Sequence, residues 1–168
     1  MVLWSDIDTS SIEMIQIKDK TKFRYQGGPL RFQVPRGMCT WGISAYKSFN
    51  IDIRNSDFIE WWAALERQLC PGTPFKSNMG PYGLRLKVDE ATYIFDESST
   101  QVNPEVREGL FRGQELSCLI DIEGTYFFNE NWGLTCRAYQ VRFYECADDE
   151  VAEPESSLMK GTCAFLPV

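Results

Sequence analysis

The sequence predicts a mainly β protein: a small β-barrel with one inserted α-helix and an acidic C-terminal tail. About six or seven short segments alternate apolar and polar residues, and glycine or proline separates most of them, as is typical of barrel strands. One segment alone repeats its apolar residues at helical spacing, so a β-α-β sheet is not indicated. With 168 residues and 43% hydrophobic residues, we expect one domain over residues 1–146 and a tail over residues 147–168.

Four predicted strand segments alternate apolar and polar side chains. They are residues 13–18, 30–34, 47–53 and 83–88. The second half of the chain consists of strands and turns, with further predicted strands at residues 92–95, 115–124, 125–128 and 132–145, of which 115–124 is a buried strand. We expect a turn at residues 25–29, where Gly27, Gly28 and Pro29 follow one another, and a second turn after Gly124. The second turn would fold residues 125–128 back on residues 115–124 as a hairpin.

Residues 55–70 form the predicted helix. Its apolar stripe consists of Phe58, Trp61 or Trp62, Leu65 and Leu69. Asp57 and Glu60 fit a capping box at the start, and Pro71 with Gly72 ends the helix. We expect the two tryptophans to face the core rather than a ligand.

Composition argues against several classes of enzyme. The chain has no histidine, which removes the usual general base and the commonest zinc ligand. Acids such as Asp121 and Glu123 share a strand face and would suit a metal-dependent nuclease, but exposed strand faces often carry acids. We therefore predict no catalytic activity and no cofactor, with a nuclease as an alternative.

The six cysteines form no close pair in the sequence. The chain also starts without a basic and then apolar signal segment, and it contains no apolar run long enough to cross a membrane. We expect free thiols, no membrane association and a location inside a cell.

Charge is distributed unevenly along the chain. Residues 22–54 contain six basic residues and one acid, whereas residues 146–168 contain five acids and one lysine, in a protein of net charge −7. Six aromatic residues lie among the basic ones. This asymmetry favours a polyanion partner, because cations pair with phosphates and aromatic faces stack on bases. The alternative is a core of aromatic residues beneath a solvated cationic face.

The candidate nucleic-acid-binding residues are cations and polar residues on predicted outer strand faces, together with aromatic residues near loops. They are Arg31, Gln33, Arg36, Trp41, Lys47, Arg85, Lys87, Tyr126, Phe128, Trp132 and Arg137. Tyr46 and Tyr82 are further candidates for stacking. For each of these aromatic residues taken alone, the alternative is that its side chain packs in the core.

The order of several motifs resembles one protein family. The segments PLRFQVPRG (29–37), Trp41-Gly42, KSFNIDI (47–53), the helix and LRLKV (84–88) precede a closing segment at 111–145. Together they resemble the phage-type single-stranded-DNA-binding proteins, and more closely their relatives in large nucleocytoplasmic DNA viruses.

The resemblance covers roughly residues 29–145 and implies an OB-fold barrel with a helix between its strands. It also implies sequence-independent binding of unwound DNA in viral replication or recombination, in the host cytoplasm or nucleus. The family's acidic tail recruits replication proteins; here Lys160 and the apolar end make the tail less acidic than that pattern. The alternative is a viral structural or protein-interaction β-domain without nucleic-acid binding, and the sequence leaves a homodimer open.

Overall fold

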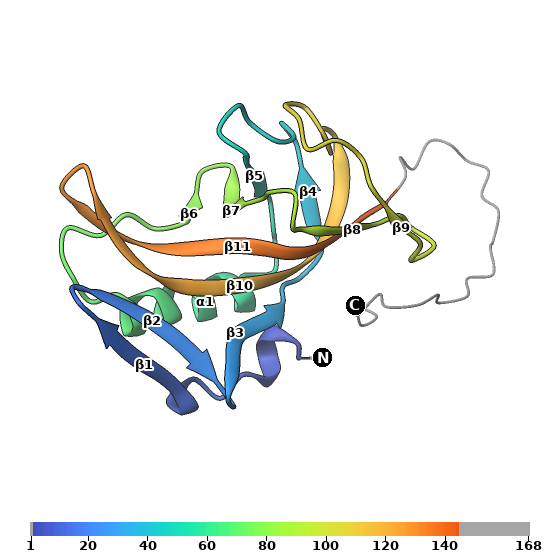
Figure 1. Ribbon diagram of the computed structural model, residues 1–168. Helices are drawn as coiled ribbons and strands as arrows, with labels where there is room; N and C mark the ends of the chain where they lie inside the picture. Colours follow the sequence, from blue (N-terminus) through green and yellow to red (C-terminus); the bar gives the residue numbers. More distant parts are fainter. Residues whose placement is uncertain (1, 145–168) are drawn as a thin grey trace.

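The computed structural model describes residues 2–144, which form a mainly β fold with one α-helix, as predicted. The helix, α1 (Ser56–Leu69), lies against one face of a long sheet (Figure 1). Two short 3-10 helices, Trp4–Asp6 and Thr9–Ser11, precede the first strand. The predicted tail at residues 147–168 and the predicted domain end at residue 146 lie outside the described residues.

The strands build one sheet. They are β1 (Ile12–Ile17), β2 (Lys20–Tyr25), β3 (Gly28–Gln33), β4 (Gly37–Cys39), β5 (Ser48–Ile51), β6 (Met79–Gly80), β7 (Gly83–Lys87), β8 (Tyr93–Phe95), β9 (Gln101–Val102), β10 (Gln114–Phe128) and β11 (Asn131–Tyr144). The main hydrogen-bonded order is β1-β2-β3-β10-β11-β7-β5, and β4 pairs with β10.

The sheet curls toward a barrel without closing along this path. β4 reaches the residue after β5 through an isolated bridge between Met38 and Asp52. Two backbone hydrogen bonds form this bridge, with N···O distances of 3.2 and 2.8 Å. The curled end brings β4, β5 and β7 together, which is where the candidate site lies.

The two long strands β10 and β11 differ from the prediction. Gly124 does not begin a turn, because β10 continues to Phe128 with a bulge between Ile122 and Gly124. The strand β2 comes so close there that a Cβ on residue 124 would lie 2.5 Å from the carbonyl oxygen of Thr21. The turn lies instead at Asn129 and Glu130, whose φ angles are 53° and 65°. Glycine at 124 therefore permits close strand approach rather than chain reversal.

The helix begins with a cap that the sequence analysis missed. Asn55 Oδ1 accepts a hydrogen bond of 3.0 Å from the backbone N–H of Phe58, so the predicted capping box of Asp57 and Glu60 is wrong. The expected core stripe is confirmed, because Trp62 is fully buried and Trp61 packs edge-on against Phe32.

The four described cysteines, at positions 39, 70, 118 and 136, are free and buried, as expected for small core residues. Burial raises the pKa of the Cys39 thiol to about 11 and raises the pKa of Cys118 further. Among residues 2–144, no helix has both the length and the apolar character that crossing a bilayer requires.

Candidate nucleic-acid interface

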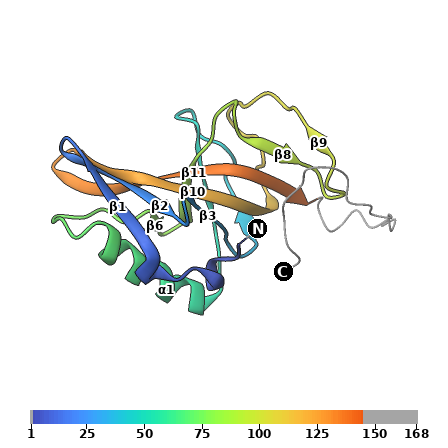
Figure 2. The same cartoon turned by 60° about the horizontal axis from the view of Figure 1, so that its bottom comes forward.

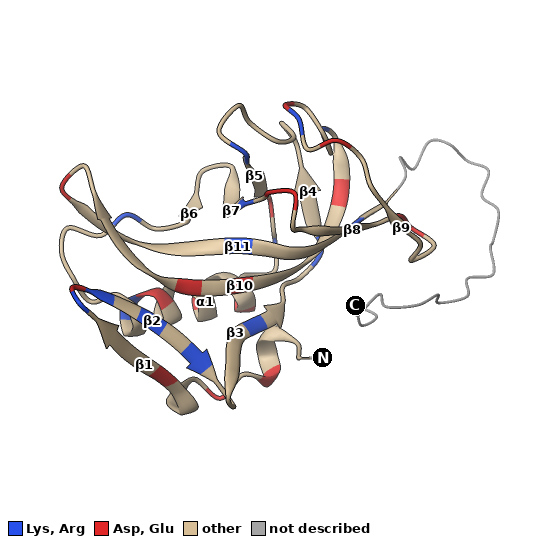
Figure 3. Ribbon diagram, viewed as in Figure 1, with Lys and Arg blue, Asp and Glu red and all other residues tan. Residues whose placement is uncertain are grey.

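A row of five side chains crosses the outer face of the sheet. The register places Arg31 (β3) opposite Asp121 (β10), Asp121 opposite Arg137 (β11), Arg137 opposite Lys87 (β7), and Lys87 opposite Ser48 (β5). Residues directly opposite on neighbouring strands share a face. The row therefore brings three of the predicted cations onto one surface, with an acid among them. In Figure 3 the strands β3 and β11, which carry blue segments, lie on the two sides of β10, which carries red ones.

Arg31 is neutralised within this row. Its Nε and Nη2 donate to the two carboxylate oxygens of Asp121 at 2.6 and 3.0 Å. The guanidinium carbon also lies 3.4 Å from the ring centroid of Tyr139. The hydrogen bonds with Asp121 raise the pKa of Arg31. Because both Asp121 oxygens hold one guanidinium, this fork-to-fork contact fixes the Arg31 side chain against the sheet.

Arg137 makes a similar contact with Asp89, the second residue after β7. Its Nε and Nη2 donate to the Asp89 carboxylate at 3.2 and 3.1 Å. The hydrogen bond from Arg137 lowers the pKa of Asp89. Arg137 is therefore held in a bidentate pair beside Lys87.

Two further predicted cations also have acidic partners. Arg36 contacts Glu115 at 2.7 Å and lies 3.5 Å above the ring centroid of Tyr144, and Lys47 contacts Glu90 at 3.3 Å. Four of the six predicted cations are therefore in ion pairs within the chain. We call Arg31, Arg36, Lys47 and Arg137 the paired cations.

Gln33 was predicted on the outer face and is instead fully buried, so this assignment is wrong. Gln33 lies opposite Leu119 on β10, and Leu119 is fully buried in a small apolar cluster with Phe95. Opposite residues share a face, so the Gln33 side chain lies on the face that carries this cluster. The N-terminal segment pairs with the backbone at this end of β3: the Gln33 N–H donates to the carbonyl of Val2 at 2.8 Å, and Leu3 forms a parallel bridge with Gln33. The apolar start of the chain, Val2-Leu3-Trp4, was the available signal that this segment packs on the domain.

Trp41 and Tyr82 form an exposed aromatic pair. Their exposed fractions are 58% and 61%, and their rings meet edge to face with centroids 6.4 Å apart. Trp41 lies in the loop after β4, and Tyr82 in the turn between β6 and β7 (Figure 1). The Trp41 loop is held close to residues 109–110, since a Cβ on Gly42 would lie 2.8 Å from both carbonyl oxygens there. A packed loop base thus supports an exposed ring.

Arg85 and Lys87 follow Tyr82 along β7. Both are exposed, opposite Asn50 and Ser48 of β5, and neither forms an ion pair with any residue between 2 and 144. We call them the unpaired cations and call Trp41, Tyr82, Arg85 and Lys87 together the aromatic–cation strip. From residue 82 to residue 87 the strip is about 17 Å long, at roughly 3.4 Å per strand residue.

The other predicted aromatic residues lie elsewhere, at the tip of the β10–β11 hairpin (Figure 1). Phe128 is 70% exposed and Phe127 is 57% exposed. Trp132 is half-buried against Phe127, with ring centroids 5.1 Å apart, and Tyr126 is half-buried beside Gly133. The predicted site is therefore divided: Trp41, Arg85 and Lys87 gather at the curled end of the sheet, whereas Tyr126, Phe128 and Trp132 lie at the hairpin.

Sequence reasoning missed the acidic partners of the paired cations. Strand alternation indicates the face of β10 on which Asp121 lies, but it does not indicate which strands lie beside β10 or which cations they bring to Asp121. Among the described residues, no three His, Cys, Asp or Glu side chains gather where they could hold a metal ion. Comparison with family models, with curated proteins and with solved structures returned no match to this chain.

Proposed function

We propose that this protein binds single-stranded DNA without sequence readout, along the aromatic–cation strip, and holds unwound DNA in viral replication or recombination. One observation carries the proposal. The exposed Trp41–Tyr82 pair contains the residue just before β7, and that strand carries two exposed cations that have no acidic partner among residues 2–144.

The strip offers the two kinds of contact that a single strand needs. Unpaired bases stack on aromatic rings for about 1–3 kcal/mol each, whatever the base, and cations contact the phosphates. A duplex keeps its base faces covered, so the Trp41 and Tyr82 rings would add little to duplex binding. The expected preference is therefore for single strands over duplex, with little dependence on base composition.

The choice of DNA and of a viral setting rests on the resemblance of residues 29–145 to the phage-type single-stranded-DNA-binding proteins. Three of the four residues of the strip lie in segments that carry this resemblance: Trp41 in Trp41-Gly42, and Arg85 and Lys87 in LRLKV (84–88). Recruitment of replication proteins by residues 147–168 is part of the same proposal.

A second candidate function is a viral structural or protein-interaction domain without nucleic-acid binding. The paired cations favour it, because Arg31, Arg36, Lys47 and Arg137 already have carboxylate partners. Exposed Phe127 and Phe128 would then contact a protein.

Fluorescence anisotropy with labelled oligo-dT, with and without competing duplex, tests the two functions at several salt concentrations. Two phosphate contacts should give a log–log salt slope of about −1.4, at roughly −0.7 per contact. Arg85→Ala should weaken binding several-fold, whereas Arg67→Ala, which removes an exposed charge from α1, should not. Equal affinity for duplex, or equal loss in both variants, would contradict DNA binding at the strip.

A further inference from the structure

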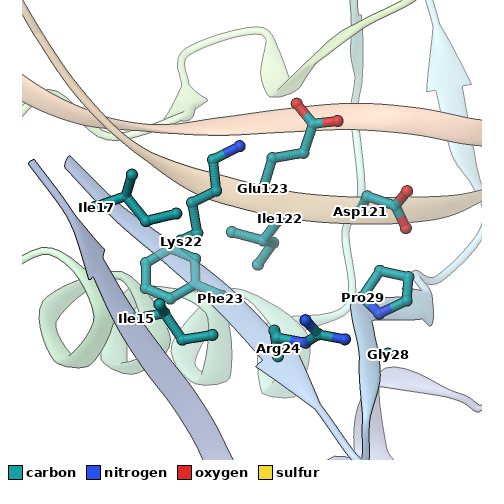
Figure 4. Close-up of a pocket in the computed structure, with 10 residues that line it drawn as sticks. All are labelled: Ile15, Ile17, Lys22, Phe23, Arg24, Gly28, Pro29, Asp121, Ile122 and Glu123. Carbon is teal, nitrogen blue, oxygen red and sulfur yellow. The ribbon is translucent and has the colours of Figure 1, made fainter.

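Glu66 is a buried acid without an ion pair. Charged side chains usually lie at the surface, as Lys22, Arg24 and Glu123 do around the hollow beside β1 and β2 (Figure 4). In the part of the chain that the structure describes, only Asp121 and Glu66 are buried charged residues, and only Glu66 lacks a cationic partner. Burial raises the pKa of Glu66, because an isolated charge is costly away from water. The charge alone does not stabilise the fold, so the contacts of Glu66 explain its position better.

Glu66 joins α1 to the segment that leads into β6. Its two carboxylate oxygens accept hydrogen bonds from Ser77 Oγ at 2.6 Å and from the Asn78 N–H at 2.8 Å. Ser77 Oγ in turn accepts a hydrogen bond of 2.9 Å from the Met79 N–H. In Figure 2, α1 lies beneath the part of the sheet that contains β6. One carboxylate therefore fixes the last two residues before β6 and, through Ser77, the first residue of β6.

The residue that Glu66 holds also closes the short hairpin that carries Tyr82. The Asn78 carbonyl accepts a hydrogen bond of 2.9 Å from the Arg85 N–H, and Asn78 Nδ2 donates to the Arg85 carbonyl at 3.3 Å. Between these two residues, β6 and β7 pair as far as a two-residue turn, Pro81-Tyr82. A turn this short leaves Tyr82 little freedom once both strands are fixed.

The two strands of this hairpin are held by different neighbours. β7 pairs with β5 and β11, and a Cβ on Gly83 would clash with the carbonyl oxygen of Ile51. Among the described strands, β6 pairs with β7 alone. Lys76 donates its N–H to the Trp132 carbonyl at 2.8 Å, but this contact precedes the hairpin. On the β6 side, the hairpin therefore depends on Glu66.

We propose that Glu66 is a positioning residue of the aromatic–cation strip: it holds the β6 side of the hairpin and so keeps the Tyr82 ring against Trp41. This role rests on the proposed function, which it deepens. Stacking depends on the relative geometry of the rings, so a displaced Tyr82 would bind a base less well. Glu66 is 4% exposed and does not itself meet DNA. Its effect on affinity therefore passes through the hairpin, while β5 keeps Arg85 in place.

A double-mutant cycle on oligo-dT affinity tests this role. Glu66→Gln keeps the size of the side chain but places an amide nitrogen toward one of the two donors, so one hydrogen bond is lost. We expect affinity to fall about fivefold, the lower end of the value of one stacked base. In a Tyr82→Ala chain, the same change should have almost no further effect. Glu60→Gln, an identical change of charge at an exposed position of α1, should leave both chains unchanged. An equal fall in both chains, or an effect of Glu66→Gln no larger than that of Glu60→Gln, would overturn the inference.

Amide hydrogen exchange without DNA tests the contact separately from DNA binding. The Asn78 N–H should exchange about tenfold faster in Glu66→Gln, whereas the amides of β10 should exchange as in the native chain. Ser77→Ala removes one donor and leaves the carboxylate in place, so it replaces Glu66→Gln in both measurements if that variant does not fold. An unchanged Asn78 amide in Glu66→Gln would overturn the inference. Faster exchange in a chain whose native form binds no oligo-dT would contradict the proposed function, while the contact between Glu66 and the hairpin would stand.

Discussion

The outer face of the sheet carries two groups of cations that look alike in the sequence and differ in the fold. Arg31 and Arg85 each alternate with apolar residues of their own strand, LRFQV and GLRLKV. Arg31 lies opposite Asp121 and is held by both of its oxygens, whereas Arg85 lies opposite Asn50 and has no acidic partner among residues 2–144. Strand neighbours, rather than strand alternation, decide which cations are free to meet a polyanion.

The largest contrast is expected in stability. Arg31→Ala leaves the Asp121 carboxylate, whose side chain is 9% exposed, without its bidentate partner. We expect a loss of about 2–3 kcal/mol in the free energy of unfolding, measured in urea, because a shielded charge loses its hydrogen bonds. Arg85→Ala should stay within about 0.5 kcal/mol of the native chain.

A double variant gives the control for this prediction. Arg31→Met with Asp121→Leu removes both charges, so most of the lost stability should return. If Arg31→Ala alone were as stable as Arg85→Ala, the pair would contribute nothing to folding and the contrast between the two groups would fail.

The next largest effect is expected in oligo-dT affinity, which should depend on one of the two aromatic regions and not on the other. Trp41→Ala removes a stacking surface from the aromatic–cation strip, and we expect oligo-dT affinity to fall by about 1–3 kcal/mol. Phe128→Ala removes a ring that is more exposed, 70% against 58%, but lies at the hairpin and should leave affinity unchanged. Anisotropy titrations of both variants decide the matter; a larger loss for Phe128→Ala would move the site to the hairpin.

These contrasts show which features of the fold and of the candidate site could be predicted from the sequence. Alternation correctly placed Arg85 and Lys87 outward, and helical spacing correctly placed Phe58 and Leu65 in the core, because both periods are local properties of the backbone. The failures involve contacts distant in sequence. Gln33 lies opposite the buried Leu119, 86 residues later in the chain, and Asp121 meets Arg31 across 90 residues.

The prediction of a turn after Gly124 was also wrong because of a contact that is distant in sequence. A glycine indicates a turn only when no neighbouring chain needs the space of its missing Cβ, and β2 needs that space here. The eleven predicted site residues were chosen by residue type and strand alternation, but whether they lie together depends on strand order. The sequence was sufficient to predict the mainly β fold with one helix. It was not sufficient to tell which of the predicted site residues lie close together.

A smaller effect compares two lysines at the same end of the sheet. Lys87→Ala should reduce the log–log salt slope of oligo-dT binding by about 0.7, the value of one phosphate contact on a single strand. Lys47→Ala should change it less, because Lys47 already contacts Glu90 at 3.3 Å and its charge is partly neutralised before any phosphate arrives. Equal changes in the two slopes would show that pairing with Glu90 does not withhold Lys47 from DNA.

The smallest effect is the response of the Arg137–Asp89 ion pair to acid. The hydrogen bond from Arg137 lowers the pKa of Asp89 below its ordinary value of 3.8. A carboxylate with a lowered pKa in the folded state adds stability above the unfolded-state pKa, and that stability is lost as pH falls through the folded-state pKa. The stability curve of the native chain should therefore fall more steeply below about pH 4 than that of Asp89→Asn, which cannot titrate there. Because the Asp89 side chain is 47% exposed, solvent screens the pair and the difference in slope should be small.

Urea midpoints measured at intervals from pH 3 to pH 6 give the stability curves of the native chain and of Asp89→Asn. Glu105→Gln is the control, since Glu105 is an exposed acid outside the ion pairs described above, and its curve should follow that of the native chain. If Asp89→Asn and the native chain kept a constant separation down to pH 3, the ion pair with Arg137 would not contribute to acid stability, and the paired cations would be no more tightly held than the unpaired ones.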